Sequence, residues 1–573
     1  MRLRKFSLSF LIMVAVGMAQ LLCLDAMAEF RHGLVAEVGA PFHHDGTANR
    51  DAVHHDRLTA PWDEAHRTQV AARRWVQSQR DPEVPGKAAR GDERSAEPMA
   101  LSVRDLVQLV RQKNEQILIQ DQEWGIAQEA VEGAKAIFEP AFVSSYQHED
   151  LSQRNTVREI VSLGFIPVFA EKSNRYGGAI ETLAPTGARF RLGYDLRAFR
   201  NTLDEQYGVN REYKTFLGAS VTQPLLKNGG MTTTMAEIRV AEADADIAFQ
   251  TYREQTMRSI SDAIATYWDL ALSQKIYDVR KASVRIAEEL LRDNEERVRT
   301  GKMAETEVFE ARAGLDRRKS FLSEAKQAIV TTTNRVRTLF SSSTAEKNMQ
   351  ITATDPLDTE VLELDYGDSL VKALKLRPEY ISTRRKVERE DIRLVFAKNQ
   401  RWPQLDLTGS YGLNGLSDSF SGSWDDAWDH DFKTWSIGVE LRIPLTGDRK
   451  SRSELEATKK RKKQALLELK AIEVNLANAV DTAIQSVRST QEQVRYFSNV
   501  EDSRERLLRA EIARFDAGKS NSRLLLEKEE ELHFAREAKL NSIVNHKKAL
   551  LDLELAEGSL LLNYDVDIME EDL

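Results

Sequence analysis

Apolar positions along most of the chain recur every three or four residues, which is the spacing that places side chains on one face of an α-helix. Ile260, Ile264 and Tyr267 form one such series. The two longest helical stretches, 231–300 and 449–517, contain neither glycine nor proline, so nothing in them interrupts a helix. A helix of about 70 residues is roughly 105 Å long. The pattern therefore predicts two helices far longer than a globular domain requires.

Four shorter helical stretches accompany the two long ones. They are 101–137, 303–340, 366–399 and 519–562. The first two together, and the last two together, are about as long as one long helix, so each pair stacked end to end matches it. Gly301 and Gly518 lie where a long helix must turn back into a shorter one, and glycine permits such a reversal. We therefore predict helical hairpins with glycine tips, packed as in coiled coils.

A second periodicity, of two residues, marks two segments as β-strands. Their apolar positions are Leu405, Leu407, Tyr411 and Leu413 in one segment, and Trp435, Ile437, Val439, Leu441 and Ile443 in the other. Such alternation suits a membrane strand with one lipid face and one wet face, although soluble antiparallel sheets also alternate. If the apolar faces meet lipid, the pore is lined by Asp406, Thr408, Ser436, Glu440 and Arg442. The residues between the strands, 414–434, predict an exposed loop.

Three landmarks occur twice in the same order, which indicates an internal repeat. Ala134-Lys135 before Pro140 recurs as Ala397-Lys398 before Pro403. Gln223-Pro224-Leu225 recurs as Ile443-Pro444-Leu445. Arg297 to Lys302 recurs as Arg514 to Lys519. Each repeat is predicted as helix, strand, loop, strand, long helix, tip and helix. Repeat 1 covers 101–340 and repeat 2 covers 366–565, with an equatorial linker at 341–365. Repeat 1 carries a longer insertion, roughly 151–213, in which 177–198 forms a further candidate hairpin.

The two ends of the chain differ from this pattern. Residues 1–28 combine a positive start, an apolar run and Ala26-Met27-Ala28, and predict a secretory signal peptide; an uncleaved anchor is the alternative. The only cysteine, Cys23, lies in this segment. Residues 29–100 are rich in proline and scattered charges, and predict a disordered or surface-wrapping arm. Residues 566–573 form an acidic tail.

Composition excludes several classes of function. The net charge of −9 argues against nucleic acid as a partner, because phosphate binding needs a basic face. The chain contains no nucleophile–base constellation, phosphate loop or HExxH spacing, so we expect neither an enzyme nor a cofactor. Five histidines between 43 and 66 lie in the irregular arm, where nothing fixes a metal geometry, and we predict no metal site.

The strands need a partner if they enter a membrane. After the signal segment no stretch is apolar for the ~20 residues that a spanning helix needs. Four strands cannot close a barrel, and an open sheet edge is not tolerated in lipid. Three copies would supply twelve strands and a helical tube below them. The fold expected is therefore an α+β membrane protein: a trimeric 12-stranded barrel continued by a long α-helical coiled-coil barrel, with two internal repeats per chain.

These features resemble the TolC-like outer membrane efflux protein family. The residues that carry the resemblance are Leu101 to Asn114, the helix before Pro140, Gln223 to Leu226 with Gly229-Gly230, Tyr267 to Leu270, and the two glycine tips. The segment Pro185-Thr186-Gly187 resembles a subgroup with a longer first extracellular insertion. The resemblance covers roughly 101–565.

The resemblance implies a homotrimer in the outer membrane, with its helices in the periplasm. It implies as partners outer-membrane lipid, a periplasmic adaptor protein and an inner-membrane pump of the RND or ABC type. The channel would be the passive exit duct of a tripartite efflux pump or a type I secretion system. The alternative from the residues alone is a periplasmic or surface coiled-coil scaffold, which the alternating strands argue against.

The resemblance also implies site residues at the periplasmic tips. The candidates for adaptor contact are Gly301, Lys302, Gly518 and Lys519. The two acidic positions that ring the closed aperture in the family are matched by Leu524 and Glu527, so one acidic ring is lost. Glu307 matches the acidic position on the first hairpin. Its tyrosine and arginine partners are matched by Phe515 and Ser520, so this gate must be held differently.

Overall fold

The computed structural model describes residues 99–162, 164–206, 208–340, 350–359, 363–445 and 447–566. The predicted signal peptide at 1–28, nearly all of the arm at 29–100 and nearly all of the tail at 566–573 lie outside these ranges.

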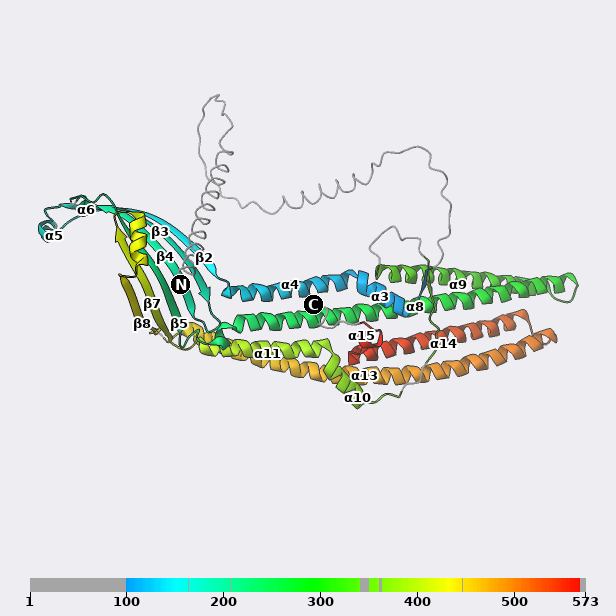
Figure 1. Cartoon of the computed structure of the whole chain (residues 1–573). Helices are drawn as coiled ribbons and strands as arrows, with labels where there is room; N and C mark the ends of the chain where they lie inside the picture. The colour runs from blue at the N-terminus through cyan, green and yellow to red at the C-terminus, as the bar shows by residue number, and fades with distance from the viewer. Residues whose placement is uncertain are drawn as a thin grey trace, which may run out of the picture. The chain divides into compact units, whose positions relative to one another are not determined.

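Long helices make up most of the described chain (Figure 1). The main ones are α3 (Val103–Lys113), α4 (Glu115–Lys135), α8 (Ala236–Arg299), α9 (Glu305–Thr338), α10 (Tyr366–Leu376), α11 (Pro378–Asn399), α13 (Arg449–Asp516) and α14 (Ser522–Glu557). Short helical turns are η1 (Ala136–Phe138), α5 (Val157–Ser162), α6 (Thr202–Gln206), α7 (Met231–Thr234), α12 (Phe420–Trp428) and α15 (Leu560–Asn563). The two longest, α8 with 64 residues and α13 with 68, lie close to the predicted 231–300 and 449–517.

Two of the shorter helices are broken where the sequence analysis expected single ones. Asn114, in extended backbone, ends α3 and caps α4 by accepting hydrogen bonds from the N–H groups of Gln116 (3.1 Å) and Ile117 (3.3 Å). The break between α10 and α11 falls at Arg377, because the following Pro378 disfavours helical backbone in the residue before it. The expected helices 101–137 and 366–399 are therefore each two helices.

The helices pack side by side in one layer. Next to the sheet the order is α4, α8, α11 and α13, and toward the tips α9, α8, α14 and α13 (Figure 1). A core of buried apolar side chains joins α3, α8 and α14 midway along α8, and includes Leu106, Ile264, Tyr267 and Val544. No helix within the described residues is long and apolar enough to span a membrane.

Tyr267 joins two distant segments of the chain to α8 at this level. Its hydroxyl lies 2.5 Å from Asp355 Oδ2 and 3.0 Å from the Leu101 carbonyl, and it accepts from the N–H groups of Thr354 and Asp355, each at 3.1 Å. Burial and the Asp355 carboxylate raise the pKa of Tyr267 to about 12. The short strands β1 (Met99–Leu101) and β6 (Ile351–Ala353) pair in parallel beside it. The end of the predicted arm is thus part of a sheet.

The larger sheet has six antiparallel strands in the order β2-β3-β4-β5-β7-β8. They are β2 (Ala141–Arg154), β3 (Val168–Leu183), β4 (Arg189–Asn201), β5 (Glu212–Pro224), β7 (Gln404–Ser417) and β8 (Lys433–Arg442). The prediction of four strands per chain was wrong, because the sheet has six. The candidate hairpin at 177–198 is confirmed, as parts of β3 and β4. Residues 168–201 supply two full strands, β3 and β4, which lie between β2 and β5.

The Pro185-Thr186-Gly187 turn lies at the helical end of the sheet. It joins β3 to β4 on the side where β2 begins and β5 ends, so it is not part of a loop at the far end as expected from the resemblance. Gly187 has φ +86°, and a Cβ there would lie 2.7 Å from the Asn228 carbonyl oxygen, so only glycine fits. The chain links at the far end are 155–167 and 202–211, which contain α5 and α6.

The predicted loop 414–434 is largely structured. β7 continues to Ser417, and α12 then folds back over the far end of the sheet (Figure 1). Ser423 lies 2.8 Å, Oγ to Oγ1, from Thr215, and the Trp424 ring packs edge-on against Tyr194 at 5.1 Å between centroids. Gly415 allows this approach, because a Cβ there would collide with the Ser423 carbonyl. Buried apolar contacts thus override the glycine- and aspartate-rich composition.

Candidate functional site

The two helical tips are built on the same backbone turn. Gly301 and Gly518 have φ values of +72° and +70°, in the left-handed region that favours glycine. The N–H of Lys302 donates to the Arg297 carbonyl, and the N–H of Lys519 donates to the Arg514 carbonyl, each at 2.8 Å. All four predicted adaptor-contact residues (Gly301, Lys302, Gly518 and Lys519) are exposed at these tips. Adaptor contact remains a prediction.

Glu307 joins the first hairpin to the second through the backbone. Its carboxylate accepts a hydrogen bond from the N–H of Ser522, the first residue of α14, at 2.9 Å. Asn294, which is fully buried on α8, donates to the Ser522 hydroxyl at 2.8 Å and to the Glu307 carbonyl at 3.3 Å. The sequence analysis considered only side-chain partners for Glu307 and so missed this contact. A backbone N–H is present in every residue except proline, so it cannot be recognised from the residue type.

Phe515 and Ser520 make other contacts in place of the missing family bonds. Phe515 is buried, and the Arg297 guanidinium lies over its ring at 5.1 Å from the centroid. Ser520 donates to the buried Glu511 carboxylate within the second hairpin. Leu524 is half-buried, and Glu527 is exposed, 4.0 Å from Lys528. The structure therefore brings Glu307 and Phe515 into contacts between hairpins but leaves Leu524 and Glu527 outside them.

A buried charge cluster further along the hairpins was not predicted. Arg318 on α9 pairs with Glu529 on α14, and both side chains are at least nine-tenths buried. Glu529 also accepts from Ser283 on α8 at 2.7 Å and lies 2.6 Å from His533 Nε2. Arg318 donates in addition to the Leu526 carbonyl at 3.0 Å. Three helices therefore meet at one buried ionic centre, which we call the Glu529 cluster.

The Glu529 cluster holds its carboxylate ionised. Burial alone would raise the pKa of Glu529, but the hydrogen bond and charge of His533, the charge of Arg318 and the Ser283 hydroxyl outweigh it, so the pKa lies below its usual range. A second pair lies beside it: Arg280 Nε donates to Glu537 at 2.8 Å and Arg280 Nη1 donates to the Phe321 carbonyl at 2.8 Å. In the sequence Glu529 was hidden in a run of acidic residues that looked like a solvated helix face.

The five predicted pore residues lie on one face of the sheet. Ser410 and Ser436 are cross-strand partners with hydroxyls 2.8 Å apart, and Thr408 donates to the Gly438 carbonyl at 3.2 Å. Asp406 lies opposite Glu440, which pairs with Arg442 at 2.9 Å. This face of β7 and β8 is therefore mainly polar.

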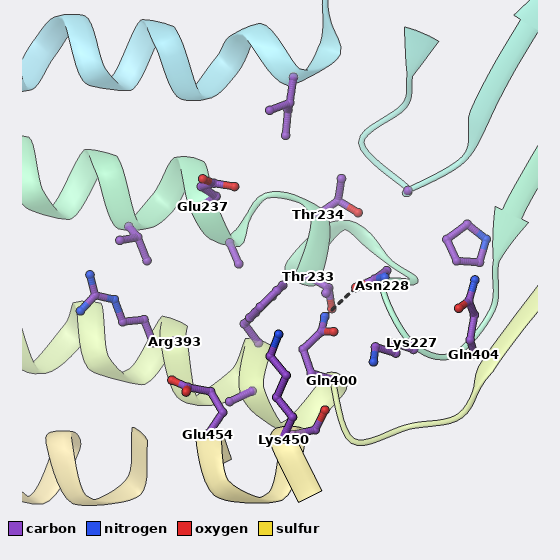
Figure 2. A pocket seen from close by; sticks show the side chains of 18 of the residues that line it. Lys227, Asn228, Thr233, Thr234, Glu237, Arg393, Gln400, Gln404, Lys450 and Glu454 are labelled. Carbon is purple, nitrogen blue, oxygen red and sulfur yellow. Dashed lines mark hydrogen bonds between the residues drawn. The ribbon is translucent and has the colours of Figure 1, made fainter. Parts of the chain in front are cut away.

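A cavity of about 850 Å³ continues this polar face toward the helices (Figure 2). Arg189, Thr222, Gln404 and Asp406 line it from the strands, and Glu237, Arg393, Gln400 and Glu454 line it from the helices. Gln400 donates to the Asn228 side-chain oxygen at 2.6 Å across its floor. The cavity mixes both signs of charge and is lined by neither a nucleophile–base pair nor a phosphate loop. Within the described ranges no group of three or more His, Cys, Asp or Glu side chains is placed to hold a metal ion.

Residues 370–559 match the family described as outer membrane efflux protein. The chain carries an outer membrane efflux protein domain. This match confirms, over residues 370–559, the resemblance found from the sequence. Comparison with curated proteins found no match.

Solved structures share the fold of the efflux protein domain and of the chain before it. The Campylobacter jejuni CmeC outer membrane channel aligns with a TM-score of 0.57 and 15% identity, over 84% of this chain and 94% of that one. VceC from Vibrio cholerae aligns with a TM-score of 0.57 and 15% identity, over 80% and 96%. The open state of the Neisseria gonorrhoeae MtrE outer membrane channel aligns with a TM-score of 0.55 and 14% identity, over 84% and 98%.

The Glu529 cluster yields a stability prediction. Arg318→Met leaves a buried carboxylate without its cation, and we expect it to reduce the free energy of unfolding by about 3–5 kcal/mol. Urea unfolding followed by circular dichroism measures the loss. The matched control is Arg317→Met, since Arg317 pairs with Glu530 on the surface, where an ion pair contributes roughly 0–1 kcal/mol. Equal losses in the two variants would contradict the special role of the buried pair.

Proposed function

We propose that the protein is the passive outer-membrane exit duct of a tripartite efflux pump or a type I secretion system, working as a homotrimer. The observation that carries the proposal is a sheet with two unpaired edges and two unlike faces, attached to a single layer of long helices. Such a sheet is incomplete alone, and the long helices have the reach to cross the periplasm.

The sheet edges call for further copies of the same chain. Among the described residues β2 pairs with β3 alone and β8 pairs with β7 alone, so each leaves one row of backbone N–H and C=O groups without a strand partner there. β2 runs away from the helices and β8 runs toward them, so β8 of one copy is antiparallel to β2 of the next. Head-to-tail pairing of this kind closes into a ring. Closure removes the edges, which hydrocarbon does not tolerate.

The two faces of the sheet suit lipid outside and water inside. One cross-strand row contains Phe142, Ile180, Leu192, Ala219, Tyr411 and Trp435. The adjacent row on the other face contains Ala141, Glu181, Arg191, Ser220, Ser410 and Ser436. In the single chain the large side chains of the apolar row are 49–69% exposed at Phe142, Ile180, Leu192, Tyr411 and Trp435. They would be covered by lipid in the assembled barrel.

The tips would meet the periplasmic adaptor and the pump, of the RND or ABC type. The exposed glycine turns face away from the sheet at the far ends of the long helices (Figure 1). Closure would draw on the contacts between hairpins described above, with Glu307 and Ser522 nearest the tips. Three copies of Glu527 around the axis would add a negative potential at the entrance. Its exposure within a single chain supports this role.

The mature protein is expected to run as a trimer after detergent extraction from the outer-membrane fraction. The reason is that one chain cannot satisfy the backbone of β2 and β8 in lipid. Mass photometry or light scattering with detergent correction measures the mass. A soluble monomer in the periplasmic fraction would sink the proposal and favour the scaffold alternative.

Charge reversal at Glu440 is expected to shift ion selectivity toward anions in planar bilayer recordings. Glu440 lies on the polar face, so three copies change the lumen charge together. Glu440→Gln should give a smaller shift in the same direction as Glu440→Lys, because it removes a charge without reversing it. Unchanged reversal potentials in both variants, with intact trimers, would show that Glu440 does not line the pore.

Gly518→Val is expected to impair export while leaving the trimer in the membrane. A side chain at φ +70° costs roughly 1–2 kcal/mol at a turn that has open space around it. The control is Ala517→Val, the neighbouring residue with φ −77°, which carries no such strain. Export of a pump substrate and the yield of trimer are measured together. Loss of the trimer in Gly518→Val would assign the glycine to folding instead.

A further inference from the structure

We infer that β3 and β4 are part of the membrane barrel wall, so that three copies close a barrel of eighteen strands and not twelve. The inference rests on the proposed function, because it concerns the barrel of that channel. Three observations carry it: the pairing of the hairpin, the phase of its two faces, and the width of the helical wall below it.

The hairpin is an integral part of the sheet and not a flap laid over it. β3 pairs with β2 along the whole of Ala141–Arg154, and β4 pairs with β5 from Glu212 to Thr222. β2 has no contact with β5 in the sheet order, so without the hairpin the two halves of the sheet would separate. A twelve-stranded barrel would require β2 to leave β3 and find β5, exchanging a full ladder of hydrogen bonds.

The hairpin turn is fixed to the helical rim of the sheet. The Thr186 carbonyl accepts from the N–H of Gly230 at 3.1 Å and from the Gln223 side chain at 3.2 Å. Gly187 touches the Asn228 backbone, as described above. The turn therefore sits in line with the ends of the neighbouring strands, at the same level as the start of the helices.

The two faces of the hairpin are in phase with those of the neighbouring strands. Ile180 and Leu192 continue the apolar row, whereas Glu181 and Arg191 continue the polar row and lie 3.5 Å apart as an ion pair. Tyr146 and Tyr176 pack at 5.2 Å on the apolar face, and Asp150 and Lys172 pair at 3.0 Å beyond them. An aromatic pair followed by charges is the order expected where hydrocarbon ends and water begins.

Six strands make the sheet about as wide as the layer of helices in the same chain. Six strands spaced by ~4.8 Å and tilted by ~40° span about 38 Å of a barrel's circumference. Four packed helices spaced by ~9–10 Å span about the same width. Four strands would span only about 25 Å by the same estimate. Each copy therefore offers a sheet as wide as its own helical wall.

The extra strands would also change the lumen. Because barrel diameter rises roughly in proportion to strand number, eighteen strands in place of twelve widen the barrel by about half. The hairpin places four arginines on the polar face (Arg175, Arg189, Arg191 and Arg197) and three acidic residues (Glu171, Glu181 and Asp195). The outer part of the duct would then be wide and slightly basic.

Nitroxide accessibility in proteoliposomes tests the inference. Replacing Cys23 with Ser removes the only cysteine of the chain, so single cysteines can be labelled. Leu192→Cys and Arg191→Cys probe β4, and Ile437→Cys and Ser436→Cys probe β8, which belongs to the barrel in either count. We expect labels at 192 and 437 to be relaxed mainly by oxygen, and labels at 191 and 436 mainly by a water-soluble nickel complex. Ile180→Cys replaces Leu192→Cys if the latter does not form trimers.

The outcomes separate the inference from the function. If 437 and 436 alternate but 192 and 191 are equally open to the nickel complex, the hairpin lies outside the wall and the barrel has twelve strands. If neither pair alternates in a trimer, the sheet does not span lipid and the proposed channel fails as well. Alternation at both pairs, with eighteen strands counted by electron cryomicroscopy of the same trimer, supports the inference.

Discussion

Backbone hydrogen bonding at the edges of the sheet is the constraint on which the rest of the molecule depends. In the part of the chain that the structure describes, four strands of this sheet have neighbours on both sides, and β2 and β8 do not. The cost of an unpaired peptide group in hydrocarbon is several kcal/mol, so no packing of side chains can compensate for an open ladder. In the proposed assembly, ring closure with identical copies would satisfy it. The layer of helices would follow the same ring because α4, α8, α11 and α13 are each connected to a strand of the sheet.

The helical layer is held by a different kind of interaction. Apolar packing dominates around Tyr267, where the core is widest. Toward the tips the apolar contacts thin out to Val284, Ala287 and Leu315, and the Glu529 cluster lies among them. A buried ion pair often contributes less to stability than apolar side chains of the same volume. Its hydrogen bonds, however, restrict the two helices to one relative position. The end proposed to engage partners is thus joined by specific, directional bonds and not by a large apolar core.

The sequence predicted the helices well because their signals are local. The absence of glycine and proline and the two tip glycines place α8 and α13 within a few residues, and the alternation in β7 and β8 is regular. β3 was harder, since Gly177-Gly178 and the charges at Lys172 and Arg175 blur its period of two. Its place in the sheet depends on pairing with β2 and β4, which no local pattern reports. Because β3 and its pairing were not recognised, only four strands per chain were predicted.

The candidate site was predictable to a similar extent. The tip glycines and the polar positions of β7 and β8 are visible as patterns. The Glu307 contact is not, because Ser522 contributes its backbone N–H. The Glu529 cluster is invisible for another reason: burial of one glutamate among several depends on how α8, α9 and α14 meet. Both contacts join residues that are more than 200 positions apart in the sequence, so no local pattern reveals them.

The breaks at Asn114 and Arg377 have a mechanical consequence. α8 and α13 run without interruption from the tips to the sheet, whereas the short helices beside them stop and restart midway. In the proposed duct, torque applied at a tip would therefore reach the sheet mainly through the two uninterrupted helices, α8 and α13. The short helices could slip at their joints and absorb the twist. The proposed duct could then turn at its inner end while its outer rim stayed still.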